Sequence, residues 1–159
     1  MVNKKVIVTG GNRGIGKGIV LSLLDKGYSV LATSRDSNNF DFSHSGLKIA
    51  DLDVCDQSSV DDFQKIVSEF DPDILVNNAG TTKDNLFLRM TESDWDEVIN
   101  TNLNSVFRVT KLVVKGMLKK KWGRIINISS ISGSMGNSGQ TNYSASKAGV
   151  DAFSRSLAK

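Results

Sequence analysis

Short apolar runs alternate with amphipathic helical patterns along the whole of the sequence. Runs rich in Val, Ile and Leu predict five strands, at residues 4–10, 28–33, 47–54, 73–80 and 123–130. Apolar residues at helical spacing predict four helices, at residues 15–24, 60–70, 92–120 and 143–159. The segment 34–46 is long enough for a crossover between parallel strands, but its sequence does not predict a full helix.

The predicted strands are continuous apolar runs rather than alternations of apolar and polar residues. Such runs are typical of parallel strands that are covered by helices on both faces. Strands and helices that alternate in this way predict an α/β fold with a doubly wound parallel sheet, the Rossmann fold. The length of 159 residues, with no linker or repeat, predicts one domain over residues 1–159.

Composition and charge exclude several classes of protein. Hydrophobic residues make up 39% of the chain and charged residues 23%, which are ordinary values for a globular protein. The net charge of +3 is too small to indicate nucleic-acid binding, and no apolar run is long enough to span a bilayer. With one cysteine, Cys55, and one histidine, His44, neither a disulfide framework nor a metal site is expected. Because the N-terminus also lacks a signal-peptide pattern, we expect a cytoplasmic protein.

A glycine-rich turn lies between the first predicted strand and the first predicted helix. Its sequence, TGGNRGIG at residues 9–16, permits a tight turn and close approach of the backbone to a pyrophosphate. The N-terminus of the helix then offers free N–H groups and a positive dipole to the phosphates. The candidate cofactor-binding residues of this turn are Gly10, Asn12, Arg13, Gly14, Ile15 and Gly16. The alternative is a purely structural turn, but the flanking strand and helix favour phosphate binding.

A second short motif, NNAG at residues 77–80, ends the fourth predicted strand. Ligands of open α/β sheets bind at the carboxyl ends of the strands, so Asn78, Ala79 and Gly80 are candidate cofactor-binding residues. Taken alone, the motif is equally compatible with an ordinary connection between a strand and a helix.

A serine, a tyrosine and a lysine form the candidate catalytic group. Tyr143 and Lys147 are four residues apart in a predicted helix, so their side chains share one face. A phenol has an ordinary pKa of about 10, and a nearby ammonium favours its ionised form. Such a pair can exchange a proton with a carbonyl oxygen, and Ser130, at the tip of the fifth strand, can bind the same oxygen. The alternative is an ordinary surface helix in which the Tyr and Lys have no chemical role.

Together, these motifs resemble those of the short-chain dehydrogenase/reductase family. TGGNRGIG is similar to the family's cofactor turn TGxxxGxG, NNAG matches its signature after the fourth strand, and YSASK matches its YxxxK motif. Ser130 matches the family's catalytic serine, and Asn102 matches an asparagine that supports a proton relay through water and the lysine. The resemblance implies an oxidoreductase that acts on CH–OH groups, with Tyr143 and Lys147 also contacting the cofactor.

Longer stretches, such as TTKDNLFLRM and NTNLNSVFRVTK, resemble the branch of the family that reduces 3-oxoacyl thioesters of acyl carrier protein. This resemblance implies NADPH-dependent formation of the 3-hydroxyacyl thioester in fatty acid biosynthesis. Tyr143 would be the general acid, Lys147 would assist it and hold the nicotinamide ribose, and Ser130 would orient the ketone. A homotetramer and a bacterial-type cytoplasmic location are also implied, with a plastid as the alternative location.

The acidic carrier protein implies basic residues near the entrance of the site. Lys121 falls at such a position of the family, and Arg89 is a second candidate. The competing interpretation of the run from Lys119 to Lys121 is a helix end at which cations offset the helix dipole.

Arginines favour NADP over NAD as the cofactor. An acid at the tip of the second strand suits the ribose hydroxyl of NAD, whereas an arginine suits the 2′-phosphate of NADP. Arg35 lies at that tip and Arg13 in the glycine turn, while Asp36 is the residue that would favour NAD. Asp53 matches the family position near the adenine ring, and Val54 is assigned to the same site by the resemblance.

One feature departs from the family pattern. Family members continue beyond the helix that carries Tyr143, whereas this sequence ends at Lys159. We therefore expect a C-terminally truncated Rossmann domain, which is either a fragment of a longer product or a shortened form. Two other functions stay open: a sibling reductase for another ketone, sugar or secondary alcohol, and an inactive cofactor-binding fragment.

Overall fold

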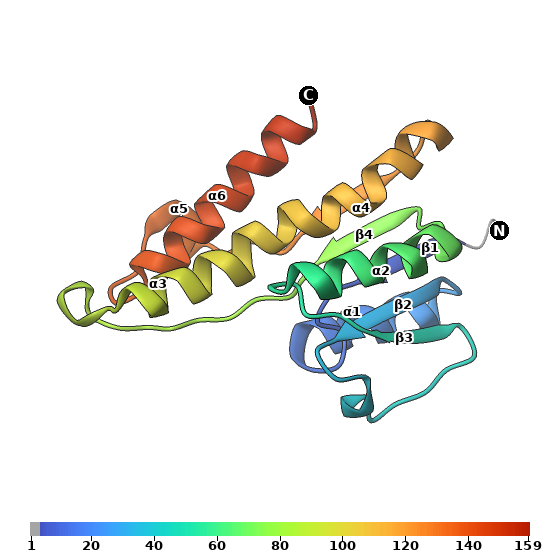
Figure 1. Ribbon diagram of the computed structural model, residues 1–159, viewed down its shortest axis with the longest axis horizontal. Coiled ribbons are helices and arrows are strands. Elements are labelled where there is room, and N and C mark those ends of the chain that lie inside the picture. The colour runs from blue at the N-terminus through green and yellow to red at the C-terminus, as the bar shows by residue number, and fades with distance from the viewer. Residues whose placement is uncertain (1–3) are drawn as a thin grey trace.

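Five parallel strands form one sheet in the computed structural model, which describes residues 4–159 (Figure 1). The strands are β1 (Lys5–Val8), β2 (Ser29–Ser34), β3 (Leu47–Asp51), β4 (Ile74–Asn77) and β5 (Arg124–Asn127). Their order across the sheet is β3-β2-β1-β4-β5, and every neighbouring pair is parallel. The strand order reverses between β1 and β4, which is where doubly wound sheets bind their ligands. The predicted fold class is therefore confirmed.

Helices cover both faces of the sheet. The helices are α1 (Gly14–Asp25), α2 (Gln57–Phe70), α3 (Glu92–Ile99), α4 (Ser105–Lys120), α5 (Ser132–Met135) and α6 (Thr141–Leu157). Of these, α1, α2 and α4 pack on the sheet, whereas α3 and α5 pack against α6. On one face, Val20 and Leu24 of α1 join a buried cluster with alternate residues of the central strands. On the other face, α2 and α4 supply Phe63 and Val113 to a second cluster, because successive strand residues point to opposite faces.

The two outer strands differ from the prediction that both faces of the sheet are covered. Ile49 of β3 is 46% exposed and Ile126 of β5 is 49% exposed, whereas the apolar residues of β1 are fully buried. An apolar run in the sequence does not distinguish a central strand from an outer one, because both carry β-branched residues. The outer strands β3 and β5 are therefore less completely covered than the central strands.

The predicted continuous helix over residues 92–120 is interrupted. The π-helical turn Asn100–Asn104 separates α3 from α4, although the two helices follow one path (Figure 1). Within this turn the Thr101 carbonyl accepts a hydrogen bond from Ser105 Oγ at 2.6 Å. A π-helical turn keeps an approximately helical apolar pattern, so periodicity alone does not reveal it, and such turns occur frequently at functional sites.

The remaining differences are short elements. The segment between β2 and β3 contains only the 3₁₀ turn η1 (Ser37–Asn39), as its sequence suggested. The four-residue helix α5 and the 3₁₀ turn η2 (Phe87–Arg89) were not predicted, because they are too short to produce a periodic pattern. In the part of the chain that the structure describes, no helix combines the length and apolar character needed to cross a membrane.

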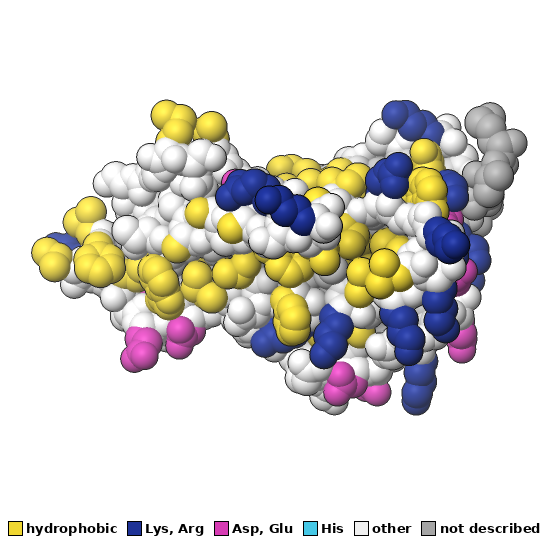
Figure 2. All heavy atoms as spheres, turned by 90° about the horizontal axis from the view of Figure 1, so that it is seen from above, with side chains coloured by type: hydrophobic (Ala, Val, Ile, Leu, Met, Phe, Trp, Pro, Cys, Tyr) yellow, Lys and Arg dark blue, Asp and Glu magenta, His cyan; other side chains and the backbone are white. Residues whose placement is uncertain are grey.

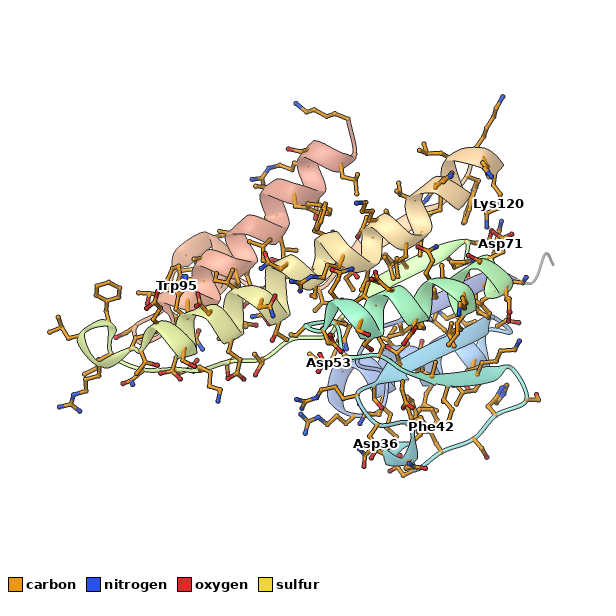
Figure 3. All side chains as sticks on the ribbon, viewed as in Figure 1. Asp36, Phe42, Asp53, Asp71, Trp95 and Lys120 are labelled. Carbon is orange, nitrogen blue, oxygen red and sulfur yellow. The ribbon has the colours of Figure 1, made fainter. Side chains whose placement is uncertain are left out.

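Asp73 joins three elements at the amino edge of the sheet. Its carboxylate accepts the Lys5 N–H at 3.1 Å and lies 3.2 Å from the Lys120 ammonium, which ends α4. Lys120 also donates to the Pro72 carbonyl at 2.8 Å. Its ammonium lies 3.2 Å from the Asp71 carboxylate, and Figure 3 shows Lys120 and Asp71 next to each other. The helix-end interpretation of the lysine run therefore holds for Lys120.

We expect Asp73→Asn to lower the free energy of unfolding by about 2 kcal/mol at neutral pH, because a charged hydrogen-bond acceptor is lost. Partial burial raises the pKa of Asp73, but the Lys5 N–H and the lysines outweigh it and hold the pKa below its ordinary value of 3.8. The carboxylate therefore stabilises the fold above its unfolded pKa, and this contribution is lost as the pH falls through the lowered pKa.

Urea unfolding of wild type and variant across the acid range measures this difference, which should shrink below about pH 4. Asp71→Asn is the control, because its carboxylate contacts the same lysine but is 57% exposed. A loss from Asp71→Asn as large as that from Asp73→Asn would contradict the assignment.

Candidate active site

The glycine turn has the backbone conformation that its sequence predicts. Gly10 and Gly14 have φ angles of +65° and +54°, in the left-handed region that favours glycine. Gly16 lies inside α1, where a Cβ would overlap the Gly10 carbonyl oxygen and lie 2.5 Å from Asn78 Nδ2. The turn is therefore compact enough that only glycine fits at residue 16.

The NNAG motif is hydrogen-bonded directly to the glycine turn. Asn78 Nδ2 donates to the carbonyls of Thr9 and Gly10 at 2.9 and 3.0 Å. Thr9 Oγ1 accepts the backbone N–H groups of Asn78 and Ala79, both at 3.0 Å. The motif thus fixes the glycine turn as well as ending β4. The role of Thr9 was not predicted, although its position as the first residue of the motif was the available signal.

The N-terminus of α1 is open to an anionic ligand. Its N-cap residue, Arg13, makes no side-chain capping bond, and the first turn contains no acidic residue. The first N–H groups of a helix have no partner within the helix, so they can bind phosphate oxygens. A Cβ at Gly14 would meet no heavy atom within 4 Å, which leaves space over the turn. The residues present therefore fit a dinucleotide phosphate.

The residues that bear on cofactor choice lie at the ends of β2 and β3. Arg13 and Arg35 are both exposed, one in the glycine turn and one directly after β2. The carboxylate of Asp36 instead caps η1 by accepting the Asn38 N–H at 2.9 Å, and Figure 3 shows it in the outer loop with Phe42. The carboxylate of Asp36, which would favour NAD, thus already accepts two hydrogen bonds from Asn38 through Oδ1.

The turn after β3 contains Asp53 and Val54. Asp53 Oδ1 accepts the Cys55 N–H at 2.8 Å, and Val54 is buried. Figure 3 shows Asp53 where the sheet meets the long connection toward α3. Since β3 is parallel to its neighbours, this turn lies on the same carboxyl edge as the glycine turn and NNAG.

Tyr143 and Lys147 lie one helical turn apart on α6, as predicted. The Lys147 ammonium lies 5.7 Å from the centre of the Tyr143 ring and donates to the Ile128 carbonyl at 2.6 Å. The lysine is only 6% exposed. Burial lowers the pKa of Lys147 below its ordinary value, and the charge of Asp151 opposes this in part. The ammonium is therefore anchored beside the aromatic ring, where it can favour a phenolate.

Ser130 follows β5, directly after two residues that bond Lys147. Its Oγ accepts the Ser132 N–H at 3.2 Å, while the neighbouring Ser129 Oγ donates to the Lys147 carbonyl at 3.4 Å. The residue after it in the chain, Ile131, is exposed. The end of β5 is thus tied to α6 directly before Ser130, through the carbonyl of Ile128 and the hydroxyl of Ser129.

Asn102 lies in the π-helical turn and is 1% exposed. Its Oδ1 accepts the Thr81 N–H at 2.8 Å, and its Nδ2 donates to the Thr81 carbonyl and to Ser146 Oγ at 2.9 and 3.1 Å. Ser146 in turn donates to the Tyr143 carbonyl at 2.7 Å. The side chain of Asn102 therefore joins the segment after NNAG to α6. Ser146 was not predicted as part of the site, although it lies within YSASK.

The two candidate docking residues lie in different places. Lys121 follows α4 and precedes β5, so it lies at the amino edge of the sheet, away from Ser130. Its expected place at the entrance of the site is therefore wrong within its own chain. Arg89 belongs to η2, which Asn85 joins to the segment before α6. The Asn85 side chain donates from Nδ2 to the Arg89 carbonyl at 3.1 Å, and its backbone N–H donates to the Gly139 carbonyl at 2.9 Å.

The lowered pKa of Lys147 predicts a pH effect on stability. Between that lowered pKa and the ordinary value of 10.5, the unfolded chain binds more protons than the folded chain. Relative to Lys147→Met, the free energy of unfolding of the wild type should therefore rise with pH through this window. Urea unfolding at a series of alkaline pH values measures it, and Lys115→Met on the exposed side of α4 controls for the lost charge. A difference that falls with pH would contradict the burial argument.

Comparison with known proteins defines the class. Residues 4–159 match the family model described as short chain dehydrogenase, and the chain belongs to this family. It is 46% identical to the 3-oxoacyl-[acyl-carrier-protein] reductase FabG of Escherichia coli K12, over 98% of this chain and 66% of that protein. The FabG proteins of Pseudomonas aeruginosa and Haemophilus influenzae are 44% and 46% identical. The match with the Pseudomonas aeruginosa protein covers 98% of this chain and 67% of that protein. The match with the Haemophilus influenzae protein covers 100% of this chain and 68% of that protein. The chain thus spans about two thirds of the length of these relatives.

Among the described residues, no group of three or more His, Cys, Asp or Glu side chains is arranged to bind a metal ion.

Proposed function

We propose that the protein to which this chain belongs is an NADPH-dependent reductase of fatty acid biosynthesis. It would convert 3-oxoacyl-[acyl-carrier-protein] to 3-hydroxyacyl-[acyl-carrier-protein]. The observation that carries the proposal is the buried ammonium of Lys147, held beside Tyr143 by the Ile128 carbonyl at 2.6 Å. The identity of 43–46% to FabG proteins supports the choice of substrate.

The cofactor would lie along the carboxyl edge of the sheet. The N–H groups from Gly14 to Gly16 would bind its pyrophosphate, and Asp53 and Val54 would contact its adenine. Arg13 and Arg35 would bind the 2′-phosphate, since neither makes a salt bridge among the residues described. When bound, NADPH supplies a hydride to the carbonyl carbon of the substrate.

The chain's own residues would manage the proton and the carbonyl oxygen. Tyr143 donates its phenolic proton to that oxygen, and Ser130 donates a hydrogen bond to the same atom. Lys147 favours the phenolate that results, because its charge is close and largely screened from water. Asn102 fixes α6 relative to the NNAG segment through Ser146, so that the phenol stays aligned.

The proposal also includes a homotetramer in the cytoplasm, with α4 and α6 in one of its interfaces. Figure 2 views the side of the molecule on which these helices lie, and hydrophobic side chains form a band along its middle. Phe107 and Leu118 of α4 are 55% and 72% exposed. Contact with a second copy would bury such residues. An acidic carrier protein would be the partner that delivers the substrate.

The test is a cofactor-oxidation assay with acetoacetyl-[acyl-carrier-protein]. We expect NADPH to be consumed, and NADH to be consumed at least about 10-fold more slowly, because two guanidinium groups lose their phosphate partner. Faster turnover of an unrelated ketone or sugar would favour the sibling reductase. Binding of NADPH without turnover of any substrate would favour a cofactor-binding fragment. A preference for NADH would contradict the roles of Arg13 and Arg35.

A further inference from the structure

Two contacts join the turn after β3 to the π-helical turn, and neither belongs to the site described above. Arg108, on the first turn of α4, donates from Nη1 to the Val54 carbonyl at 3.2 Å and to Asn100 Oδ1 at 2.8 Å. Beside it, Cys55 Sγ lies 3.2 Å from Thr101 Oγ1. Arg108 bridges the turn at residues 53–56 and the turn at residues 100–104, because it bonds one residue of each. Cys55 and Thr101 join the same two turns directly.

The partners of Arg108 are unusual for a guanidinium group. Among residues 4–159, Arg108 forms no salt bridge, and both of its hydrogen bonds go to neutral oxygens. A charged donor strengthens each hydrogen bond, and the planar guanidinium fixes their relative direction. The side chain is therefore suited to hold two backbone segments at a fixed separation.

The π-helical turn is also connected to α6, the helix that carries Tyr143. Asn102 Nδ2 donates to Ser146 Oγ, and Ser146 Oγ donates to the carbonyl of Tyr143. Asn102 and Ser146 are 1% and 0% exposed, so water does not compete readily for these bonds. A continuous set of hydrogen bonds and short backbone segments thus runs from Val54 to Tyr143.

We propose that Arg108 is a positioning residue that couples the turn after β3 to the catalytic helix. Order gained by residues 53–56 on NADPH binding would pass through Arg108 to the π-helical turn, and from Asn102 and Ser146 to Tyr143. The inference rests on the proposed function for the identity of the ligand. The coupling itself depends only on the contacts of Arg108, Cys55, Asn102 and Ser146.

Hydrogen–deuterium exchange with and without NADPH tests this coupling independently of catalysis. In the wild type, we expect NADPH to protect residues 53–56, 100–105 and 141–147 together. In Arg108→Met, residues 53–56 should still be protected. Residues 141–147 should keep only the protection that direct contact of Tyr143 and Lys147 with NADPH provides, so their total protection should fall about 10-fold, as the loss of a charged hydrogen bond predicts. Lys111→Met, on the exposed side of the same helix, should behave as the wild type.

Two further variants and a kinetic measurement separate positioning from folding. Arg108→Lys keeps the charge but not the fork of donors, so it should resemble Arg108→Met. Thr101→Val removes only the contact to Cys55 and should cause a smaller loss, which provides a test if Arg108→Met does not fold. In the active protein, Arg108→Met should lower kcat about 10-fold and leave the KM of the thioester unchanged.

Protection of residues 141–147 by NADPH in Arg108→Met equal to that in the wild type would overturn the coupling. If NADPH protects no part of the wild type, the proposed cofactor is wrong. The coupling is then tested by comparing hydrogen exchange of the wild type and Arg108→Met without ligand. In that case Arg108→Met must raise exchange in residues 53–56, 100–105 and 141–147 together. An increase confined to the first turn of α4 would refute the proposal.

Discussion

Tyr143→Phe should abolish the reduction of a 3-oxoacyl thioester while leaving the fold and the binding of NADPH intact. The variant lacks only the phenolic oxygen, and no hydrogen bond from that oxygen to another described residue holds the structure together. The general acid contributes about 10²–10⁴-fold to the rate, so we expect kcat to fall by that factor. Cofactor oxidation measures turnover, and the fluorescence of bound NADPH measures affinity.

Tyr28→Phe is the matched control. Tyr28 lies between α1 and β2 and packs against the core on the face of α1, away from α6. Its substitution should leave kcat within about twofold of the wild type, because it removes a hydroxyl that has no part in the site. Retention of more than a tenth of the activity in Tyr143→Phe would show that another group supplies the proton, and the proposed mechanism would fail.

Gly16→Ala should destabilise the protein and remove dinucleotide binding. The added methyl group would overlap the Gly10 carbonyl oxygen, which is backbone and cannot move aside as a side chain can. The added methyl group would also displace the Asn78 side chain, whose hydrogen bond to the Gly10 carbonyl holds the NNAG motif against the glycine turn. We expect a loss of about 3 kcal/mol in the free energy of unfolding, at the upper end of the range for overpacking.

Gly18→Ala, two residues further along α1, provides the opposite expectation. A Cβ at Gly18 would meet no atom within 4 Å, and the residue is exposed. Alanine should therefore stabilise the helix by up to about 1 kcal/mol, because it restricts the unfolded chain. Urea unfolding and NADPH titration of both variants measure the effects. Equal stability of the two variants would mean that the glycine turn is looser than the structure indicates.

Much of the fold was predictable because local sequence and global topology agree. Five apolar runs give five strands, and glycine-rich turns follow β1 and β4, where the order of the sheet reverses. The exposure of Ile126 in β5 and the π-helical turn around Asn102 depend on what packs against each residue. Neither feature changes the spacing of apolar residues along the sequence, so periodicity does not predict it.

The sequence by itself determined which residues are candidates for the chemistry. The spacing of Tyr143 and Lys147 puts both on one helical face, and the positions of Gly10, Gly14 and Gly16 fit a turn that accepts phosphate. These features are local, because they depend on residues within one or two helical turns of each other.

Only the tertiary structure decided how those candidates are held. The bond from Lys147 to Ile128, the ties of Asn102 to Thr81 and Ser146, and the contact of Arg108 with Val54 each span 19 or more residues. It also placed Lys121 at the opposite edge of the sheet from Ser130. Such contacts arise where parallel strands bring distant turns to one edge, which hydrophobic periodicity along the chain does not encode.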